Sequence, residues 1–473
     1  MIRMIDWADR LSGHPVYELE ALERRYFLSA VSLDPLFAEG GKLIDRRIRP
    51  AHGSDVQLLV QNDGKILVGG ATEKSGLFLA RYNADGAFDK SFSGDGLINT
   101  SDIWSFLAMT LQQDGKILVA GYSGIERLNS DGSLDQTFGD GGILRMPTGP
   151  NDMMVQASGK IVLARDELIV RLNPDGSPDL NFGWGTSYQT GYGEAYIGGF
   201  ENSALQLRPY PGGGFVATVI NGEPDVDWDY YYVRRFDEQG KPVDSFGYMG
   251  TVQPKTDDMD ITDMEVTSDG RIVFLANWGF ETDRNAIYEY RSNGEPDRRF
   301  GKNGVDIDAP LDTWGSRMTL SHDGSILVFS WQPELVAVRL NAAGKLDHTF
   351  GKDGIARTGL VASNATVAGV EDNDGHLILA GTMETGSGVK LFLVRFTSGS
   401  DAKPQVPPKP AEPQEPEDHS QEEEDDSEEE PTAVVMVGDS VAPEEGLQWV
   451  DGEGFFSRDA IDAFGKDEAM VWE

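Results

Sequence analysis

Short runs of alternating apolar and polar residues recur along the chain, and most of them run into an Asp-Gly pair. The run VQLLVQNDGKILVGG at 56–70 returns as LAMTLQQDGKILVAG at 107–121, TDMEVTSDGRIVFLA at 262–276, SRMTLSHDGSILVFS at 316–330 and VAGVEDNDGHLILAG at 367–381. Residues 153–164 and 205–218 are weaker copies. A side-chain period of two that leads into Asp-Gly is typical of two strands joined by a two-residue hairpin turn. Each copy therefore predicts a β-hairpin.

A second signature follows the first in six of the seven units. In its first copy, LARYNADGAFDKSFSGDGLI at 79–98, the alternation places Leu79, Arg81 and Asn83 on one strand face and Ala80 and Tyr82 on the other. Another Asp-Gly turn then leads into a short strand, so each unit predicts four antiparallel strands. The signature also carries a repeated Phe, which we expect to pack between neighbouring units. The repeated residues are Phe37, Phe92, Phe138, Phe182, Phe246, Phe300 and Phe350.

The spacing of the units predicts a closed ring. The turn glycines Gly64, Gly115, Gly159, Gly214, Gly270, Gly324 and Gly375 follow one another at intervals of 44 to 56 residues. The seventh unit lacks its Phe-Gly piece, and VSLDPLFAEGGKLI at 31–44 carries that piece with no first half before it. An N-terminal outer strand that completes the last unit would remove exposed sheet edges. The sequence therefore predicts an all-β fold, a seven-bladed β-propeller over residues 32–397.

The combined motif resembles that of a known family. The pattern RLNPDGSLDxxFGxGG followed by QxDGKILVAG is similar to the delta-60 repeat β-propeller family of bacterial proteins, over about three quarters of the chain. The third and fourth units depart from the pattern. The resemblance implies a propeller fold, and no common reaction or ligand comes with it.

Composition and charge exclude several classes of function. The chain has 473 residues, no Cys and a formal net charge of −39, so disulfides, Cys-ligated metals and thiol nucleophiles are ruled out. Such a negative charge disfavours nucleic acid and anionic lipid as partners. The longest apolar runs have strand length, and residues 1–20 carry charges throughout, unlike a secretory signal peptide. We expect a monomer that is cytoplasmic or is exported without a cleaved signal peptide.

The two ends differ from the repeats. Residues 1–31 contain Leu19, Leu22, Tyr26 and Ala30 near helical spacing, which predicts a short helix. Residues 398–432 are rich in Pro, Glu, Asp and Ser and predict a disordered linker. Residues 433–473 regain aromatic residues and predict an acidic tail or a docking peptide. Residues 398–473 contain 23 acidic and 4 basic residues, so they carry −19 of the total charge and leave −20 for the first 397 residues.

Candidate binding residues gather in the fourth unit. The two Asp-Gly turns of a unit must share one face of the ring, so all loops of variable length share the other, the variable-loop face. Binding sites concentrate where a rigid scaffold displays such loops. Residues 184–202 and 221–232 lie on this face and are rich in Tyr, Trp and Gly, a composition common in recognition surfaces, although the same rings can serve only to pack the loops. The aromatic residues are Trp184, Tyr188, Tyr192, Tyr196, Phe200, Trp228, Tyr230 and Tyr231. The pairs Asp102-x-Trp104 and Asp312-x-Trp314 recur between units and can line the axial mouth.

One acidic pattern suggests a metal. Asp225, Asp227 and Asp229 alternate, and clustered carboxylates are ligands that calcium prefers. Tyr230 stands where a calcium loop needs Gly, and no Glu follows at the expected spacing, so a solvated acidic loop is the alternative. No other metal or cofactor is expected.

The leading hypothesis is a non-enzymatic scaffold that binds a protein or peptide on its variable-loop face. No G-x-S-x-G elbow, phosphate-binding loop, H-E-x-x-H or complete dinucleotide motif is present. One alternative is a propeller that binds or cleaves carbohydrate with the aromatic loops of the fourth unit. Another is a protein exported without a leader, with residues 433–473 as a docking or targeting peptide.

Overall fold

The computed structural model describes residues 31–166, 168–184, 194–196, 202–221, 230–254, 259–278, 285–302, 305–306, 317–331, 334–361 and 365–397. These residues form β-strands and turns and contain no α-helix. In this part of the chain, no helix has the length and apolar character that would take it across a membrane. The expected N-terminal helix (apart from Val31), the linker and the C-terminal segment lie outside the described residues.

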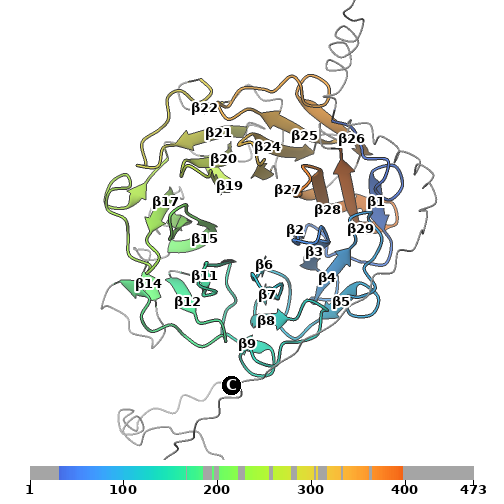
Figure 1. The fold of residues 1–473 in the computed structure, drawn as a ribbon, viewed down its shortest axis with the longest axis horizontal. Helices are drawn as coiled ribbons and strands as arrows, with labels where there is room; N and C mark the ends of the chain where they lie inside the picture. The colour runs from blue at the N-terminus through green and yellow to red at the C-terminus, as the bar shows by residue number, and fades with distance from the viewer. Residues whose placement is uncertain are drawn as a thin grey trace, which may run out of the picture. The chain divides into compact units, whose positions relative to one another are not determined.

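Seven sheets follow one another around a ring, as Figure 1 shows. We number them blades 1 to 7 in the chain order of their first strands. Blade 1 contains β2 (Val56–Val60), β3 (Ile66–Ala71), β4 (Leu77–Tyr82) and β5 (Leu97–Thr100). Blade 2 contains β6 (Ala108–Leu111), β7 (Ile117–Gly121), β8 (Gly124–Leu128) and β9 (Ile143–Arg145). Blade 3 contains β10 (Asp152–Val155), β11 (Ile161–Arg165), β12 (Leu168–Leu172), β13 (Gly183–Trp184) and β14 (Glu194–Tyr196).

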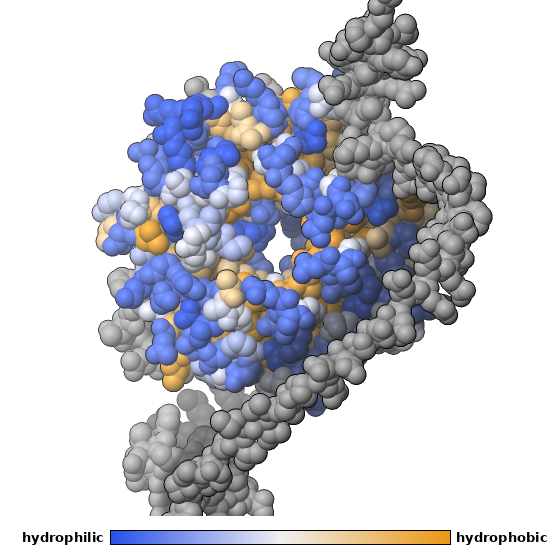
Figure 2. Space-filling model, in the orientation of Figure 1, coloured by the Kyte–Doolittle hydropathy of each residue, from blue (hydrophilic) through white to orange (hydrophobic). Residues whose placement is uncertain are grey.

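The remaining four blades each have four strands. Blade 4 contains β15 (Asn202–Pro209), β16 (Phe215–Asn221), β17 (Tyr230–Phe236) and β18 (Thr251–Val252). Blade 5 contains β19 (Met259–Val266), β20 (Ile272–Trp278), β21 (Asn285–Tyr290) and β22 (Val305–Asp306). Blade 6 contains β23 (Arg317–Leu320), β24 (Ile326–Trp331), β25 (Glu334–Leu340) and β26 (Ile355–Val361). Blade 7 contains β27 (Ala365–Glu371), β28 (Leu377–Thr385), β29 (Gly388–Phe396) and β1 (Lys42–Asp45). The first strand of a blade lies nearest the centre, where Figure 2 shows an opening.

Blade 7 closes the ring with strands from both ends of the propeller. β1 pairs antiparallel with β29, and Lys42 lies opposite Val394. The amide of Thr397 also donates to the carbonyl of Ser32 at 2.8 Å. The predicted closure by an N-terminal outer strand is therefore confirmed, and it covers the sheet edge that β29 would otherwise expose.

Blade 3 differs from the predicted four antiparallel strands. The short strand after Phe182 is β13, and it pairs in parallel with β14. β14 takes the place beside β12, with Leu168 opposite Tyr196. Residues of the 184–202 segment thus supply an additional strand, which separates β13 from the rest of the blade.

The Asp-Gly turns also differ from the predicted two-residue hairpin. In blade 1 the amide of Gly64 donates to the carbonyl of Gln61 at 2.9 Å, and the amide of Gln61 donates to the carbonyl of Lys65 at 2.8 Å. Gly64 has a φ of 79°, whereas the φ of Asp63 is not positive. This is a type I turn followed by a left-handed glycine, which makes a three-residue loop. The Asp63 carboxylate accepts a hydrogen bond from the Lys65 amide at 3.2 Å, which gives the recurring Asp its role.

Neighbouring blades are joined on the face of these turns by a repeated arginine clamp. Arg81 of blade 1 donates from Nε to Oδ2 of Asp89 at 2.7 Å and also donates to the carbonyl of Ser130 in blade 2. Its guanidinium lies 4.5 Å from the centre of the Phe92 ring. That ring is fully buried against Gly132 of blade 2, where an added Cβ would come 3.0 Å from it. The prediction that the repeated Phe packs between blades is confirmed at this seam. The ion pair, ring contact and inter-blade bond recur at Arg127, Arg171 and Arg395.

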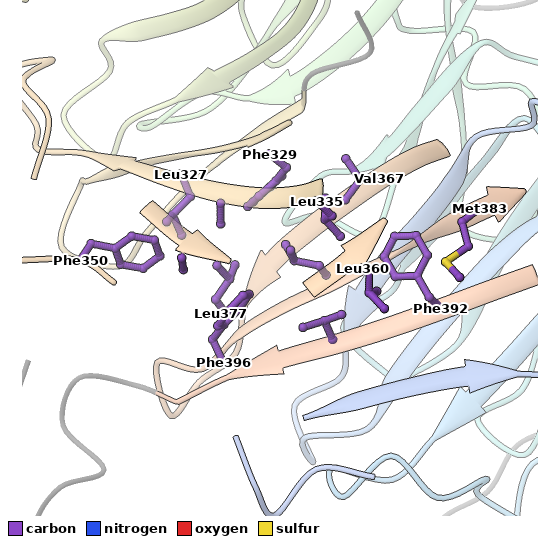
Figure 3. Close-up of a cluster of buried hydrophobic side chains, with 14 residues drawn as sticks. Leu327, Phe329, Leu335, Phe350, Leu360, Val367, Leu377, Met383, Phe392 and Phe396 are labelled. Atoms are coloured by element: carbon purple, nitrogen blue, oxygen red, sulfur yellow. The ribbon is translucent and has the colours of Figure 1, made fainter. Parts of the chain in front are cut away.

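The hydrophobic core lies between blades, so both faces of most strands are buried. On β4, Leu79 packs in the cluster between blades 1 and 2, while Ala80 and Tyr82 pack in the cluster between blades 7 and 1. This agrees with the predicted alternation. Figure 3 shows the cluster between blades 6 and 7, where Phe350 of blade 6 and Phe392 of β29 lie among aliphatic side chains.

Candidate functional site

The structure describes part of the aromatic loops that the sequence singled out. Trp184 lies in β13, Tyr196 in β14 and Tyr230 in β17. Tyr231, also in β17, is half-buried and packs against the core cluster between blades 4 and 5. The other candidates, Tyr188, Tyr192, Phe200, Trp228, Asp225, Asp227 and Asp229, and the pair Asp312 and Trp314, lie outside the described residues.

Two other aromatic side chains are exposed on the variable-loop face, where blades 1 and 2 meet. Trp104 lies in the connection between β5 and β6 and is 67% exposed. Tyr122 lies in the tight connection between β7 and β8 and is 60% exposed. The amide of Tyr122 donates to the carbonyl of Trp104 at 2.8 Å, so the two connections touch. We call residues 102–105 and 121–124 the aromatic platform.

Backbone hydrogen bonds fix the platform from several sides. The amide of Ser123 donates to the carbonyl of Ile103 at 3.1 Å, and the amide of Gly149 donates to the carbonyl of Tyr122 at 2.7 Å. Gly121 allows this close approach, because a Cβ there would lie 2.2 Å from the carbonyl oxygen of Ile103. The rings therefore stand on a backbone that is already ordered.

The platform holds its backbone in an unfavourable conformation. Trp104 has a φ of 48° and Ser105 a φ of 53°, both in the left-handed region. A bulky residue at positive φ is uncommon, and such strain costs about 1–3 kcal/mol for each residue. Strained backbone is concentrated at functional sites, where the surrounding structure holds it in place.

A buried carboxyl group lies next to the platform. Glu126 of β8 is 3% exposed, and the hydroxyl of Thr100 donates to its Oε1 at 3.4 Å. Burial, and then the nearby Asp102 carboxylate, raise the pKa of Glu126 to about 7, against the opposing effects of Thr100 and of Arg145. Sequence reasoning missed this residue and Tyr122. A comparison of the repeats would have found Glu126, because the residue before the clamp arginine is apolar in four other blades. Those residues are Ala80, Val170, Val338 and Val394.

A second charged cluster joins the inner strands of blades 3, 4 and 5. Arg208 of β15 lies 3.3 Å from Oδ2 of Asp152, 3.3 Å from Oδ1 of Asp263 and 3.4 Å from Oε1 of Glu265. Asp263 also accepts a hydrogen bond from the amide of Met318 in blade 6 at 2.9 Å. Burial raises the pKa of Glu265, while Arg208 opposes the change. The cluster therefore ties four blades together near the axis.

One group of side chains within the described residues has the spacing of metal ligands. Asp372, Asp374 and His376 of the first turn in blade 7 have ligand atoms within 4.8 Å of one another. Asp372 already accepts the amides of Asp374 and His376 and lies 2.9 Å from Nδ1 of His376. These bonds hold the turn without a metal.

Comparison with solved structures gives distant likenesses. No curated protein matches the sequence. A protein of unknown function from Dyadobacter fermentans is similar in structure with a TM-score of 0.44 at 10% identity, over 77% of this chain and 100% of its own. A gluconolactonase from Xanthomonas campestris reaches a TM-score of 0.35 at 12% identity, over 77% and 95% of the two chains. A PQQ-bound aldose sugar dehydrogenase from Streptomyces coelicolor reaches 0.37 at 13% identity, over 75% and 98%. Likenesses this distant carry no argument about activity.

A family match follows the repeat units. Residues 61–92, 112–138 and 156–182 match the family described as a domain of unknown function (DUF5122) beta-propeller. Each segment begins at the glutamine that opens the first turn of a blade and ends at the repeated Phe. The description gives a propeller without an activity, and the delta-60 designation remains a prediction. The chain is thus a seven-bladed β-propeller whose first three blades are similar to this propeller family.

Proposed function

We propose that the chain is a non-enzymatic scaffold that binds a protein or peptide on its variable-loop face, with Trp104 and Tyr122 as anchors. The observation that carries the proposal is a strained, hydrogen-bonded backbone that holds two large rings in solvent. Exposed Trp and Tyr side chains dominate the binding energy of many protein interfaces. A backbone that is ordered before binding loses little entropy when the partner arrives.

The charge of the chain supports a basic partner. The first 397 residues carry a net charge of −20, and the exposed Asp102 lies within the platform. Such a surface attracts positively charged proteins and raises their association rate at low salt. We therefore expect the association rate to fall as ionic strength rises.

Burial of the carboxyl group next to the platform supports a binding role over a catalytic one. A general acid or base must come within hydrogen-bonding distance of its substrate. Glu126 has a raised pKa, but it is 3% exposed and faces Thr100 within the seam. A molecule bound on the rings of the platform would not reach it.

The test is capture of partners by the purified full chain, followed by affinity measurement with each captured protein. We expect Trp104→Ala and Tyr122→Ala to weaken binding at least tenfold, since truncation of an anchor removes about 2 kcal/mol or more. Tyr248→Ala is the matched control, because Tyr248 is 81% exposed in the turn between β17 and β18, on the opposite face. Equal affinity for all three variants would refute the placement of the anchors.

Carbohydrate is the second candidate ligand, because exposed Trp and Tyr rings also stack on sugars. A glycan array probed with the same variants separates the two. Glycan binding that is lost in Trp104→Ala, with no protein captured, would replace the protein-binding proposal with the carbohydrate one.

A further inference from the structure

A polar groove opens on the opposite face of the propeller, between the turns of blades 1 and 2. Its volume is about 670 Å³, within the range of small-molecule pockets. The walls are two equivalent turns, residues 61–65 of blade 1 and 111–115 of blade 2, and the second turn of blade 2 adds Ser130 and Asp131. Leu111 is the one hydrophobic side chain of the lining, and the carbon atoms of the polar side chains supply most of the remaining apolar surface.

Carboxamides are concentrated in this groove. Gln61 and Asn62 open the turn of blade 1, and Gln112 and Gln113 open the turn of blade 2, so four amide side chains line one cavity. No other blade has two carboxamides at these positions. The equivalent pairs are Gln156-Ala157, Tyr210-Pro211, Thr267-Ser268, Ser321-His322 and Asp372-Asn373. The arrangement is therefore a departure from the repeat at one seam.

The hydrogen bonds of these amides are incomplete. In blade 3, Gln156 accepts a hydrogen bond from Arg171 at 3.1 Å and donates to the carbonyl of Glu238 at 3.1 Å, which bridges the seam to blade 4. In blade 1, Gln61 accepts a hydrogen bond from Arg81 at 3.4 Å, and its amide nitrogen donates to no group of the described chain. The Oε1 of Gln112 is buried and accepts no hydrogen bond from the described residues. An unsatisfied buried acceptor is costly, so a rotation of the half-buried Gln112 side chain that turns Oε1 toward a donor on a ligand in the groove would be favoured.

The cations of the groove are already neutralised. Lys65 lies 3.2 Å from Asp63 and 3.4 Å from Asp89, and Arg81 is held by Asp89 at 2.7 Å. Burial alone would raise the pKa of Asp89, but hydrogen bonds from Ser91 and the Arg81 guanidinium outweigh it and lower that pKa to about 2. Asp131 adds a further carboxylate at the rim. Among the described residues that line the groove, no cation is left unpaired for an anionic ligand.

We propose that the groove between the first turns of blades 1 and 2 binds a neutral, polyhydroxylated ligand of the size of a mono- or disaccharide. Carboxamides both donate and accept hydrogen bonds, as sugar hydroxyl groups do, and the carboxylates at the rim accept further hydroxyl protons. The internal ion pairs disfavour phosphorylated sugars and uronic acids. This site lies on the face opposite the aromatic platform and does not depend on the function proposed for it.

The experiment is saturation-transfer NMR and calorimetric titration of the full chain with stated sugars. The neutral probes are glucose, galactose, mannose, N-acetylglucosamine, maltose, cellobiose and lactose, and the anionic comparators are glucuronate and glucose 6-phosphate. We expect at least one neutral sugar to bind, and the comparators to bind at least tenfold more weakly. No binding by any neutral probe, or preference for an anionic comparator, would overturn the proposal.

Matched variants locate the site. Asn62 and Gln113 are exposed turn residues, so the double variant Asn62→Leu, Gln113→Leu should fold and should weaken the sugar at least tenfold. Ala157→Leu places the same side chain at the equivalent exposed position of blade 3 and should leave binding unchanged. Hydrogen exchange of residues 61–65 and 111–115 should slow when the sugar is added. Binding that survives the double variant, or that Trp104→Ala removes, would refute this placement and assign the sugar to the platform.

Discussion

The buried carboxyl group of Glu126 should make the propeller less stable as pH rises, and Glu126→Gln should remove that loss. Glu126 has a folded-state pKa of about 7, compared with 4.5 for an unperturbed glutamate. A raised folded-state pKa means that folding is favoured while the group stays protonated and is penalised once it ionises. The contribution is therefore complete below pH 4.5 and is lost as pH rises through about 7. Gln keeps the shape of the protonated acid and can still accept the hydrogen bond from Thr100.

The magnitude follows from the pKa difference. A shift of 2.5 units from 4.5 to about 7, at about 1.4 kcal/mol per unit, corresponds to roughly 3.4 kcal/mol. About 2.5 kcal/mol of this loss falls between pH 5 and pH 8. For a propeller of about 366 residues the unfolding entropy is about 0.8 kcal/mol per degree, so the difference amounts to roughly 3 °C in Tm.

The assay is differential scanning calorimetry of both proteins at pH 5, 6, 7 and 8. The Tm of Glu126→Gln should rise relative to the unmodified protein by about 3 °C across this range. Glu39→Gln makes the same change of charge at an exposed residue and should show no such trend. Parallel pH profiles for Glu126→Gln and the unmodified protein would refute the reasoning, because they would show that Glu126 ionises without cost, with its charge compensated by Arg145.

Three further variants test the packing and strain, each by calorimetry. Gly132→Ala should lower Tm more than Gly94→Ala. Both glycines have a left-handed φ (88° and 86°), but only Gly132 meets the ring of Phe92. Equal losses of Tm would assign the cost to backbone strain alone. Trp104→Gly should be more stable than Trp104→Ala by about 1 kcal/mol, since alanine keeps the left-handed strain and glycine does not; the reverse order would contradict the strain. Arg208→Met should lower the free energy of unfolding by about 3–5 kcal/mol, and this loss should grow with pH as three carboxylates ionise without the guanidinium beside them. A loss of stability that does not depend on pH would show that the cluster is not held by electrostatic attraction.

The sequence predicted the blades well because each blade is encoded locally. Asp-Gly turns, period-two alternation and the repeated Phe lie within one unit, so counting the units counts the blades. Closure was also predictable, since the Phe-Gly piece missing from the seventh unit stands at residues 31–44. The exact turn type was not, because Asp-Gly is compatible both with a two-residue loop and with the observed type I turn and left-handed Gly64.

Contacts between units could not be predicted in the same way. Arg208 meets Asp152 and Glu265 only because three inner strands converge near the axis, and residues 56 and 57 positions apart in the chain give no local sign of it. The strain at Trp104 was equally hidden, because a φ of 48° depends on the hydrogen bonds that Tyr122 and its neighbours supply. Trp104 was indicated by the Asp102-x-Trp104 pattern, whereas no pattern in the sequence indicated its partner Tyr122, which lies in a short turn.

Blade 5 shows how the fold tolerates a departure from the repeat. The clamp arginine is replaced there by Glu289, which forms a new ion pair at 2.5 Å with Arg271, the residue at the position of Lys65. Asp297, at the position of Asp89, is paired instead with Arg299 at 2.7 Å.

These replacements keep the acidic and basic side chains of the blade paired, and Arg271 also donates to the carbonyl of Ala342 in blade 6 at 3.5 Å, so folding alone accounts for them. At the seam of blades 1 and 2, no second substitution among the described residues offsets the departures from the repeat. Glu126 replaces an apolar residue and forms no ion pair with the described residues, and Trp104 adopts a strained backbone while its ring stays in solvent. The amides of Gln61 and Gln112, on the other face of the same seam, also lack partners that the equivalent Gln156 has. On both faces of this seam the protein thus carries features that cost stability and that no other contact offsets. Ligand binding explains such features better than the folding of the propeller does, so this seam is where binding should be sought first.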